Sequence, residues 1–298
     1  MGNAMKYIVL EDRGLLAVGG AEARPFLQGL ISNDIDKVSA KRAIYATLLT
    51  PQGKFLHDFF IAGHGGALIF DSEAPRLADL ERRLLFYRLR AEVTIEDVTN
   101  RFVVVALIGD GAAAALGLGE AEGAATAFAG GTAYADPRLR AMGARAVLPR
   151  EGAAAALEAA GFASAPAEDY ERLRLAHGIP DGSRDIPVDK GFLLENGIDD
   201  LAGVDFDKGC YVGQELTTRT KHRAKVRKRL FRVDVDGPLP APGTPIMLGE
   251  KEAGTMRSGL DGVGLALLRT ELVDAASGEP LTAGDARLTP VKPEWASY

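Results

Sequence analysis

The chain has 298 residues, of which 47% are hydrophobic and 26% are charged, and its net charge is −6. This length predicts two or three domains with enough material for packed cores. No apolar run is long enough to span a bilayer and no signal-peptide pattern opens the chain, so we expect no membrane partner. The single cysteine, Cys210, excludes an intramolecular disulfide and favours a cytoplasmic location.

The charge is unevenly distributed along the sequence. Residues 219–232 contain eight Lys or Arg and no acid, so the remainder of the chain is strongly acidic. An acidic body with one basic run indicates a localised anionic ligand more than general coating of nucleic acid.

The first hundred residues alternate strand and helix patterns. Strands are predicted for residues 7–10 and 15–18, and apolar spacing predicts a helix over residues 21–30. Residues 43–49 and 55–62 are predicted strands, and the Pro-Gln-Gly turn between them predicts a hairpin.

The middle of the chain continues this rhythm. The predicted elements are a strand at 67–70, a helix from 75 to 85, strands at 91–98 and 102–108, helices at 112–118, 153–160 and 168–177, and a long loop at 181–189. A strand is expected at 230–235. The Pro-rich residues 237–243 then predict a domain boundary, and the Gly-punctuated strands after them predict a small β-barrel.

The most informative segment is residues 208–215, Lys-Gly-Cys-Tyr-Val-Gly-Gln-Glu. Glycine lets the backbone approach a ligand closely. Lys208 and the basic residues that follow would favour the thiolate of Cys210, as would a helix beginning at Gly213. These features predict a reactive or ligand-contacting cysteine. The alternative is that Cys210 is a small buried apolar residue, and chemistry alone does not separate the two.

Residues 208–215 resemble, over eight consecutive positions, the signature of the YgfZ family, whose eukaryotic relatives serve mitochondrial iron–sulfur assembly. Three other segments resemble family segments in the expected order: residues 26–34 (FLQGLISND), 48–54 (LLTPQGK) and 173–180 (LRLAHGIP). The resemblance extends from residue 21 to about residue 230.

The resemblance implies an α+β, GcvT-like fold: two α+β domains and a C-terminal β-barrel around a central folate-binding opening. The first domain would be discontinuous, comprising residues 5–46 and 151–236. Residues 47–150 would form an inserted α+β domain, and residues 237–298 the barrel.

Three departures from the glycine-cleavage aminomethyltransferase argue against aminomethyl transfer. His57 stands where the resemblance places the catalytic Asp, and a neutral imidazole cannot hold a developing cation as a carboxylate does. Residues 135–138 replace a segment whose Glu contacts the pterin. Ala176 replaces the Glu of the enzyme's LRLEAG segment.

Cys210 and Lys208 are the predicted catalytic residues. The predicted folate-binding residues, chosen for their place in the matched segments, are Asn33, Asp34, Arg174, Glu195, Tyr211, Gly213, Gln214 and Glu215. A pterin needs a carboxylate for its amino-pyrimidine edge, and a folate tail needs cations. Asp136 is a further carboxylate candidate, and Arg138 and Arg88 are further cations. The four histidines form no metal pair at helical spacing, so no metal site is expected.

The basic run carries cations at every second position: Lys221, Arg223, Lys225, Arg227 and Arg229. On a strand this spacing would put all five on one face. We rank three interpretations, in this order: a solvated edge strand, a site for a polyglutamyl folate tail, and an RNA contact.

The sequence therefore predicts a folate-binding accessory protein that supports the assembly or repair of iron–sulfur clusters. Its cofactor would be tetrahydrofolate or another reduced folate, and its partners assembly or client proteins. The alternative is a folate-dependent one-carbon transferase, aminomethyltransferase-like or tRNA-modifying.

Overall fold

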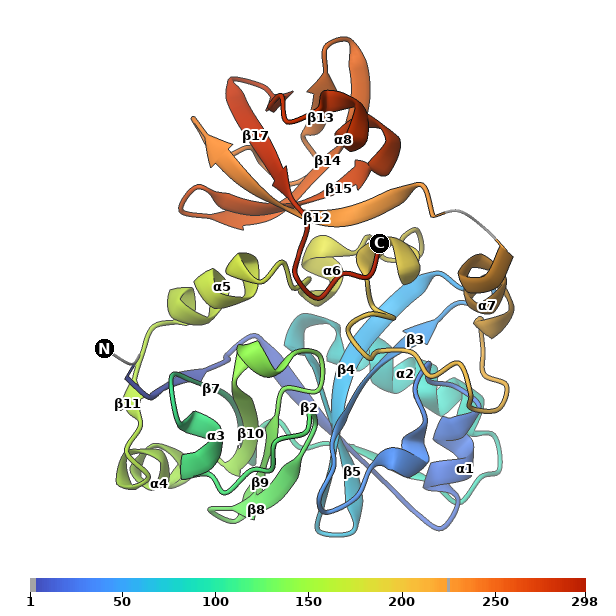
Figure 1. The fold of residues 1–298 in the computed structure, drawn as a ribbon. Coiled ribbons are helices and arrows are strands. Elements are labelled where there is room, and N and C mark those ends of the chain that lie inside the picture. The colour runs from blue at the N-terminus through green and yellow to red at the C-terminus, as the bar shows by residue number, and fades with distance from the viewer. Residues whose placement is uncertain (1–3, 224–225) are drawn as a thin grey trace. The chain divides into compact units, whose positions relative to one another are not determined.

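The computed structural model describes residues 4–223 and 226–298 (Figure 1). The chain divides into two compact units, and both are discontinuous in sequence. The first unit comprises Met1–Leu49, His57–Tyr170 and Leu201–Val212. The second comprises Thr50–Leu56, Glu171–Asp200 and Gly213–Tyr298.

Two sheets form the first unit. The six-stranded sheet has the order β11 (Ala163–Ser164), β1 (Lys6–Val9), β7 (Phe102–Ile108), β10 (Ala144–Pro149), β9 (Gly131–Ala135) and β8 (Ala125–Phe128). The five-stranded sheet has the order β3 (Ile44–Leu49), β4 (Phe55–His64), β5 (Ala67–Glu73), β2 (Arg13–Gly19) and β6 (Thr94–Asp97). Near-continuous burial along β3 and β4 indicates that both faces of their sheet are covered.

The connections of the first unit are short helices. They are α1 (Ala23–Gln28), η1 (Ile35–Lys37), η2 (Ala74–Arg76), α2 (Leu77–Arg88), α3 (Ala112–Ala115), η3 (Arg140–Met142), α4 (Ala153–Ala159) and the start of α5 (Ala167–Ala176). The helix α2 buries Leu77, Leu80 and Leu84, whose spacing of three and four residues places them on one face. Within the described residues, no helix combines the length and apolarity needed to cross a bilayer.

A buried ionic cluster joins the two sheets of the first unit. Asp71 on β5 accepts from Arg13 Nε on β2 at 2.6 Å and from Arg145 Nη2 on β10 at 2.6 Å. The guanidinium of Arg145 also lies 4.0 Å from the ring centroid of Phe60. Although burial opposes it, the two arginines lower the pKa of Asp71. Removing one member of this ionic cluster would leave a buried charge without a partner. The cluster therefore stabilises the arrangement of the two sheets.

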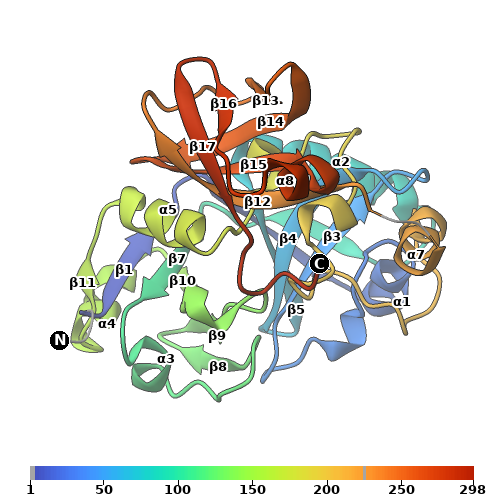
Figure 2. The ribbon, with the colours of Figure 1, turned by 45° about the horizontal axis from the view of Figure 1, so that its top comes forward.

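The second unit contains a closed six-stranded barrel. Its strand order is β12 (Lys228–Asp236), β15 (Val263–Arg269), β14 (Lys251–Leu260), β13 (Pro245–Leu248), β16 (Leu281–Ala283) and β17 (Ala286–Val291). Alternate residues such as Val233, Met256 and Leu288 fill the interior. Helix α8 (Thr270–Ala276) packs against β15 (Figure 2).

Outside the barrel, the second unit holds α6 (Gly182–Asp185), η4 (Leu194–Asn196) and α7 (Gln214–Arg223). The turn before β4 packs on the start of α7. A Cβ atom on Gly53 would lie 3.0 Å from the carbonyl oxygen of Gly213 and 3.1 Å from Leu216 Cβ. Two segments that resemble the family are therefore in contact here, and glycine permits the approach.

Several sequence predictions are confirmed. Strands β3 and β4 are hydrogen-bonded neighbours around the predicted turn, and α7 begins directly after Gly213. The barrel is present, but it begins at Lys228, and residues 237–243 connect β12 to β13 inside it.

Two predictions differ from the structure. Residues 47–150 do not form sheets of their own, because β2 pairs with both β5 and β6. The basic run is not one strand: Lys221 and Arg223 lie on α7, Arg229 lies on β12, and Lys225 falls outside the described residues. Alternating cations carry no apolar signal, so they do not discriminate between strand and helix.

Candidate functional site

Cys210 lies in an irregular loop of the first unit, and the residue is exposed to solvent. Its neighbours Lys208 and Tyr211 are buried. The alternative that Cys210 is a buried core residue is therefore wrong. Cys210 is therefore an exposed thiol between two buried side chains, in a loop that is held in place on both sides.

Lys208 anchors this loop from within. Its Nζ donates to the carbonyl oxygens of Ile31 at 2.7 Å and Asn33 at 2.8 Å, and it lies 5.1 Å from the ring centroid of Tyr211. Burial lowers the pKa of Lys208 to about 8, although the negative charge of Asp34 opposes this. These contacts show how Lys208 holds the loop in place, and its catalytic role stays a prediction.

Further backbone contacts tie residues 201–212 to residues 29–34. Val212 N–H donates to Gly29 O at 3.1 Å, and Asp205 N–H donates to Ser32 O at 3.0 Å. Ser32 Oγ donates to Gly203 O at 2.6 Å. Residues 26–34 and 208–212, which belong to segments that the sequence singled out separately, are therefore in contact within the first unit.

Asn33 and Asp34 are engaged inside this site. Asn33 Nδ2 donates to Tyr45 O and Ala202 O, both at 2.8 Å. The Asp34 carboxylate caps η1 by accepting from Asp36 N–H at 3.0 Å, and it also accepts from Gln28 at 2.8 Å. These contacts explain the two residues as supports of the loop. Their folate-binding role stays a prediction.

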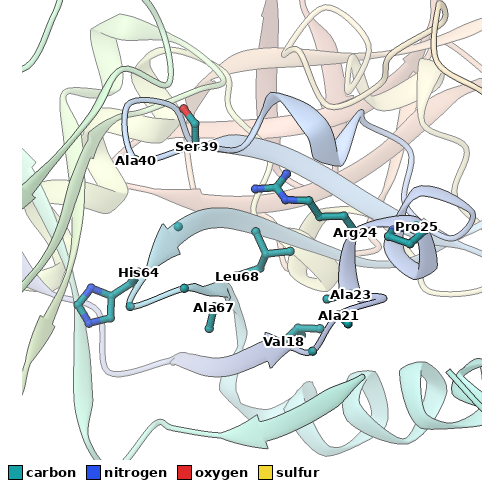
Figure 3. A pocket seen from close by; sticks show the side chains of 15 residues that line it. Val18, Ala21, Ala23, Arg24, Pro25, Ser39, Ala40, His64, Ala67 and Leu68 are labelled. Carbon is teal, nitrogen blue, oxygen red and sulfur yellow. The ribbon is translucent and has the colours of Figure 1, made fainter. Parts of the chain in front are cut away.

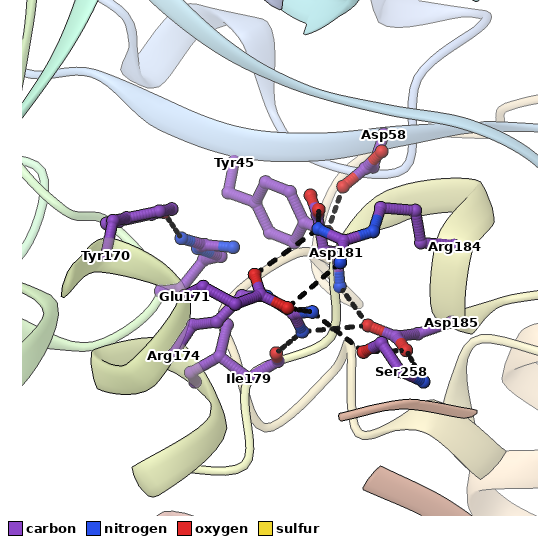
Figure 4. A network of polar contacts seen from close by, with 11 residues as sticks. Tyr45, Asp58, Tyr170, Glu171, Arg174, Ile179, Asp181, Arg184, Asp185 and Ser258 are labelled. Carbon is purple, nitrogen blue, oxygen red and sulfur yellow. Dashed lines mark hydrogen bonds and ion pairs between the residues drawn. The ribbon is translucent and has the colours of Figure 1, made fainter. Parts of the chain in front are cut away.

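Arg174 on α5 is buried in the second unit (Figure 4). Its Nε and Nη2 donate to Glu171 at 2.7 and 2.6 Å. Its Nη1 donates to Asp185 at 2.9 Å and to Ile179 O at 3.1 Å. Its Nη2 also donates to Ser258 Oγ at 2.7 Å. Because a guanidinium has five N–H donors, none remains for a folate carboxylate, and we no longer assign Arg174 that role.

Asp136 and Arg138 pair with each other in the first unit. Arg138 Nε and Nη2 donate to the Asp136 carboxylate at 3.0 and 2.8 Å, and Nη2 also donates to Tyr170 at 3.0 Å. Although burial opposes it, the negative charge of Asp136 raises the pKa of Arg138. Both are buried, so neither offers its charge to a ligand.

Glu195 is a predicted site residue with a perturbed carboxyl group, and its folate-binding role stays a prediction. It is half-buried on η4, and burial raises its pKa against the opposing positive charges of nearby Lys228, Arg257 and Lys54. The three cations were not predicted as site residues. Lys54 lies in the turn before β4, and Lys228 and Arg257 lie on strands of the closed barrel, so no local sequence pattern brought them together.

The three remaining predicted residues lie at the start of α7. Gly213 has a φ of 84°, which favours glycine, and Gln214 is the first helical residue. Glu215 is exposed, and its carboxylate accepts from Arg219 Nη2 at 2.7 Å. Gly213 and Gln214 shape the end of the motif, whereas Glu215 belongs to the solvated surface of the helix.

His57 is buried on β4, with its Nε2 3.0 Å from the Asp79 carboxylate. Burial, assisted by the positive charge of Arg76, lowers the pKa of His57 to about 4, although the contact with Asp79 acts in the opposite direction. The imidazole is therefore neutral at neutral pH.

Each unit contains a pocket among its described residues. The first unit has a pocket of about 510 Å³ lined mainly by small residues, with Arg24, Ser39 and His64 around it (Figure 3). Arg24 donates to Ile35 O and Val38 O, both at 2.8 Å, so it stabilises η1. No predicted site residue lines this pocket.

The second unit has a pocket of about 700 Å³ that includes Lys221, Arg229, Lys292 and Tyr298. Lys221 pairs with Asp199 at 2.8 Å, and Arg229 lies 4.7 Å from the Tyr298 ring centroid. The folate-tail and RNA interpretations of the basic run both stay predictions. In the described part of the chain, no group of three or more His, Cys, Asp or Glu is placed to hold a metal ion.

The sequence of the chain is similar to those of known proteins. The family profile for the CAF17 C-terminal beta-barrel domain matches residues 227–298. The chain is 35% identical over 291 residues to the mitochondrial iron–sulfur cluster assembly factor IBA57 of Homo sapiens, covering 91% of this chain and 80% of the relative. It is 32% identical over 321 residues to IBA57 of Mus musculus, covering 99% and 86%.

A solved structure shows the same fold. The glycine cleavage system aminomethyltransferase T of Bartonella henselae superposes with a TM-score of 0.78 at 16% identity, covering 99% of this chain and 87% of that one. The α+β, GcvT-like fold with a C-terminal barrel is confirmed. At this identity the likeness concerns the fold alone.

The comparisons correct one prediction and leave another open. The predicted cytoplasmic location is contradicted by the relatives, which are named as mitochondrial proteins. A lone thiol only excludes a disulfide within the chain and does not identify a compartment, so that inference went too far. Membership of the YgfZ family itself stays a prediction.

Proposed function

Because the chain belongs to the family of IBA57 iron–sulfur cluster assembly factors, we propose that it supports the assembly or repair of iron–sulfur clusters in client enzymes. The observation that carries the proposal is Cys210: the only thiol of the chain is exposed, and its loop is anchored by Lys208.

The number of thiols restricts how the protein acts. Iron–sulfur clusters are usually held by several Cys ligands, and one chain offers only Cys210. Cys210 therefore acts on a cluster that a partner protein holds in part. Because the loop around Cys210 is fixed by contacts to Ile31, Asn33 and Gly29, little ordering entropy is lost when the thiol engages the partner.

Deletion of the gene tests this proposal in cells. We expect the activity of iron–sulfur enzymes to fall while the glycine-cleavage flux stays normal. Immunoblots would check that the amounts of the iron–sulfur enzymes and of the glycine-cleavage proteins are unchanged. The opposite pattern, with normal iron–sulfur enzymes and impaired glycine cleavage, would favour the one-carbon transferase instead.

The second part of the proposal is that the protein binds a reduced folate. Two observations support it: the GcvT-like fold and the half-buried Glu195 with positive charges acting on it. Glu195 would accept hydrogen bonds from the amino-pyrimidine edge of the pterin, and Lys54, Lys228 and Arg257 would attract the glutamate carboxylates.

Titration of the full chain with tetrahydrofolate tests this part. We expect a Kd in the micromolar range, on the order of −8 kcal/mol, and a weakening of about tenfold or more for Glu195→Gln. Glu279→Gln, at an exposed glutamate outside the predicted site, is the matched control and should bind as the unchanged chain does. Calorimetry without saturable heat would remove the folate from the account, and equal affinities for the two variants would remove Glu195.

A further inference from the structure

The end of helix α2 exposes an apolar cluster. In the described part of the chain, four large apolar side chains are exposed: Leu85 (40%), Phe86 (76%), Leu89 (86%) and Leu239 (43%). Three of the four lie within five consecutive residues. Single exposed apolar residues are ordinary, but a contiguous group marks an interaction surface.

The fold does not need this cluster for its own core. Helix α2 already buries Leu77, Leu80 and Leu84 on its other face. Leu89 has a φ of 46°, a left-handed conformation that is unfavourable for a residue with a Cβ. A strained backbone that holds a leucine in solvent indicates a function for the side chain.

Cations alternate with the apolar residues. Arg88 and Arg90 are both exposed beside Phe86 and Leu89. Arg88 Nη1 donates to the backbone carbonyl of Val93 at 3.4 Å, a contact that leaves its charge unneutralised. These two exposed arginines are cations on a chain whose net charge is −6. We name Leu85, Phe86, Arg88, Leu89 and Arg90 the α2 tip.

We propose that the α2 tip binds an anionic lipid surface, with Phe86 and Leu89 inserted at the level of the headgroups and the arginines on lipid phosphates. Exposures of 76% and 86% mean that these side chains project from the surface rather than line a groove. A projecting aromatic and leucine flanked by Arg matches the chemistry of membrane-surface helices.

Two other occupants fit the observations less well. Three side chains offer an apolar area of a few hundred Å², well below the ~1,200–2,000 Å² of a stable protein–protein interface. A second copy of this chain related by two-fold symmetry would bring Arg88 and Arg90 close to the same two arginines, which repel each other. An anionic lipid surface needs less apolar area and gains from the positive charge.

The proposal goes beyond the proposed function and does not depend on it. The sequence led us to expect no membrane partner because no segment can span a bilayer. Lying on a membrane requires no such segment, since only a few side chains enter the interface. The proposal adds a place at which cluster assembly would occur, namely the surface of an anionic membrane.

Vesicle flotation of the full chain tests the proposal. One vesicle consists of phosphatidylcholine alone, and the other of phosphatidylcholine with phosphatidylglycerol. We expect the chain to float with the anionic vesicle only, and to be released as salt is raised. Phe86→Ser and Leu89→Ser should each weaken binding about tenfold or more. Arg90→Gln should weaken binding to the anionic vesicle.

Matched controls come from the same chain. Leu239→Ser removes an exposed leucine outside the α2 tip, and Arg287→Gln removes an exposed arginine on the barrel. Both should float as the unchanged chain does. All of these positions are exposed, so thermal unfolding should be nearly unchanged.

Three results would overturn the proposal. The first is that the unchanged chain floats with neither vesicle, or equally with both. The second is that Phe86→Ser and Leu89→Ser float as well as Leu239→Ser. The third is that sedimentation shows a dimer of the unchanged chain and a monomer of Phe86→Ser, which would assign the α2 tip to self-association.

Discussion

The pKa of His57 links a single residue to the stability of the first unit. In the fold this pKa is about 4, lowered by burial and by Arg76, whereas an unfolded histidine titrates near 6.5. Between these two values the unfolded chain binds a proton that the folded chain does not. The free energy of unfolding therefore falls as the pH drops through this window, by up to about 3 kcal/mol.

Replacing His57 by glutamine should remove this dependence. Glutamine keeps a polar group beside Asp79 but does not titrate, so the loss of stability between pH 6.5 and 4 should shrink by about 2–3 kcal/mol. Denaturant unfolding at several pH values measures it, with His222→Gln, exposed on α7, as the control. Parallel pH profiles for the unchanged chain and His57→Gln would show that His57 titrates normally.

The same neutral imidazole bears on catalysis. A carboxylate at this position could hold a developing cation, whereas a buried neutral His57 cannot. We therefore expect no aminomethyltransferase turnover in a reconstituted glycine-cleavage assay at neutral pH. Turnover comparable with that of a glycine-cleavage enzyme assayed beside it would contradict our interpretation of His57.

At the scale of elements, Arg174 holds parts of the second unit together. It connects α5 to α6 through Asp185 and to β14 through Ser258. Arg174→Ala should leave the buried Asp185 carboxylate uncompensated and lower the free energy of unfolding by about 3–5 kcal/mol. Thermal and denaturant unfolding measure this loss.

Arg184 is the matched control for Arg174. It is half-exposed, and it contacts the same Glu171 at 2.9 Å together with Asp181 at 2.8 Å. Because a solvated ion pair contributes little, Arg184→Ala should cost less than about 1 kcal/mol. Equal losses for the two variants would show that burial does not set the importance of Arg174.

Helices, strands and turns were easier to predict from the sequence than the ion-pair partners of charged residues. The hairpin around residues 51–53, the barrel and the start of α7 follow from turn chemistry and apolar spacing. Arg174 was predicted to bind a ligand, yet its partners lie on segments far apart in the chain. Burial of a charge depends on tertiary contacts, which a local pattern does not contain.

The candidate site was predictable only in part, because its tertiary contacts are not contained in a local sequence pattern. The segment 208–215 and the segment 26–34 were found separately by resemblance, and the structure brings them together through Lys208. That Lys208 points inward while Cys210 is exposed could not be read from their order in the chain. Both orientations are compatible with a loop of this composition.

At the scale of the whole molecule, the chain combines a GcvT-like fold with a single anchored thiol. The fold is shared with an aminomethyltransferase, whereas the relatives of higher identity are iron–sulfur assembly factors. Function therefore follows the site rather than the fold. The account requires Cys210 to matter for activity and not for stability.

Complementation with Cys210→Ser tests this central claim most directly. Cells lacking the gene would receive the unchanged chain or the variant, and the activity of iron–sulfur enzymes would be measured beside the thermal midpoint of each purified protein. Because Cys210 is exposed, we expect a change in unfolding free energy below about 0.5 kcal/mol, together with loss of enzyme activity. Full recovery of the enzymes by a folded Cys210→Ser chain would contradict the account.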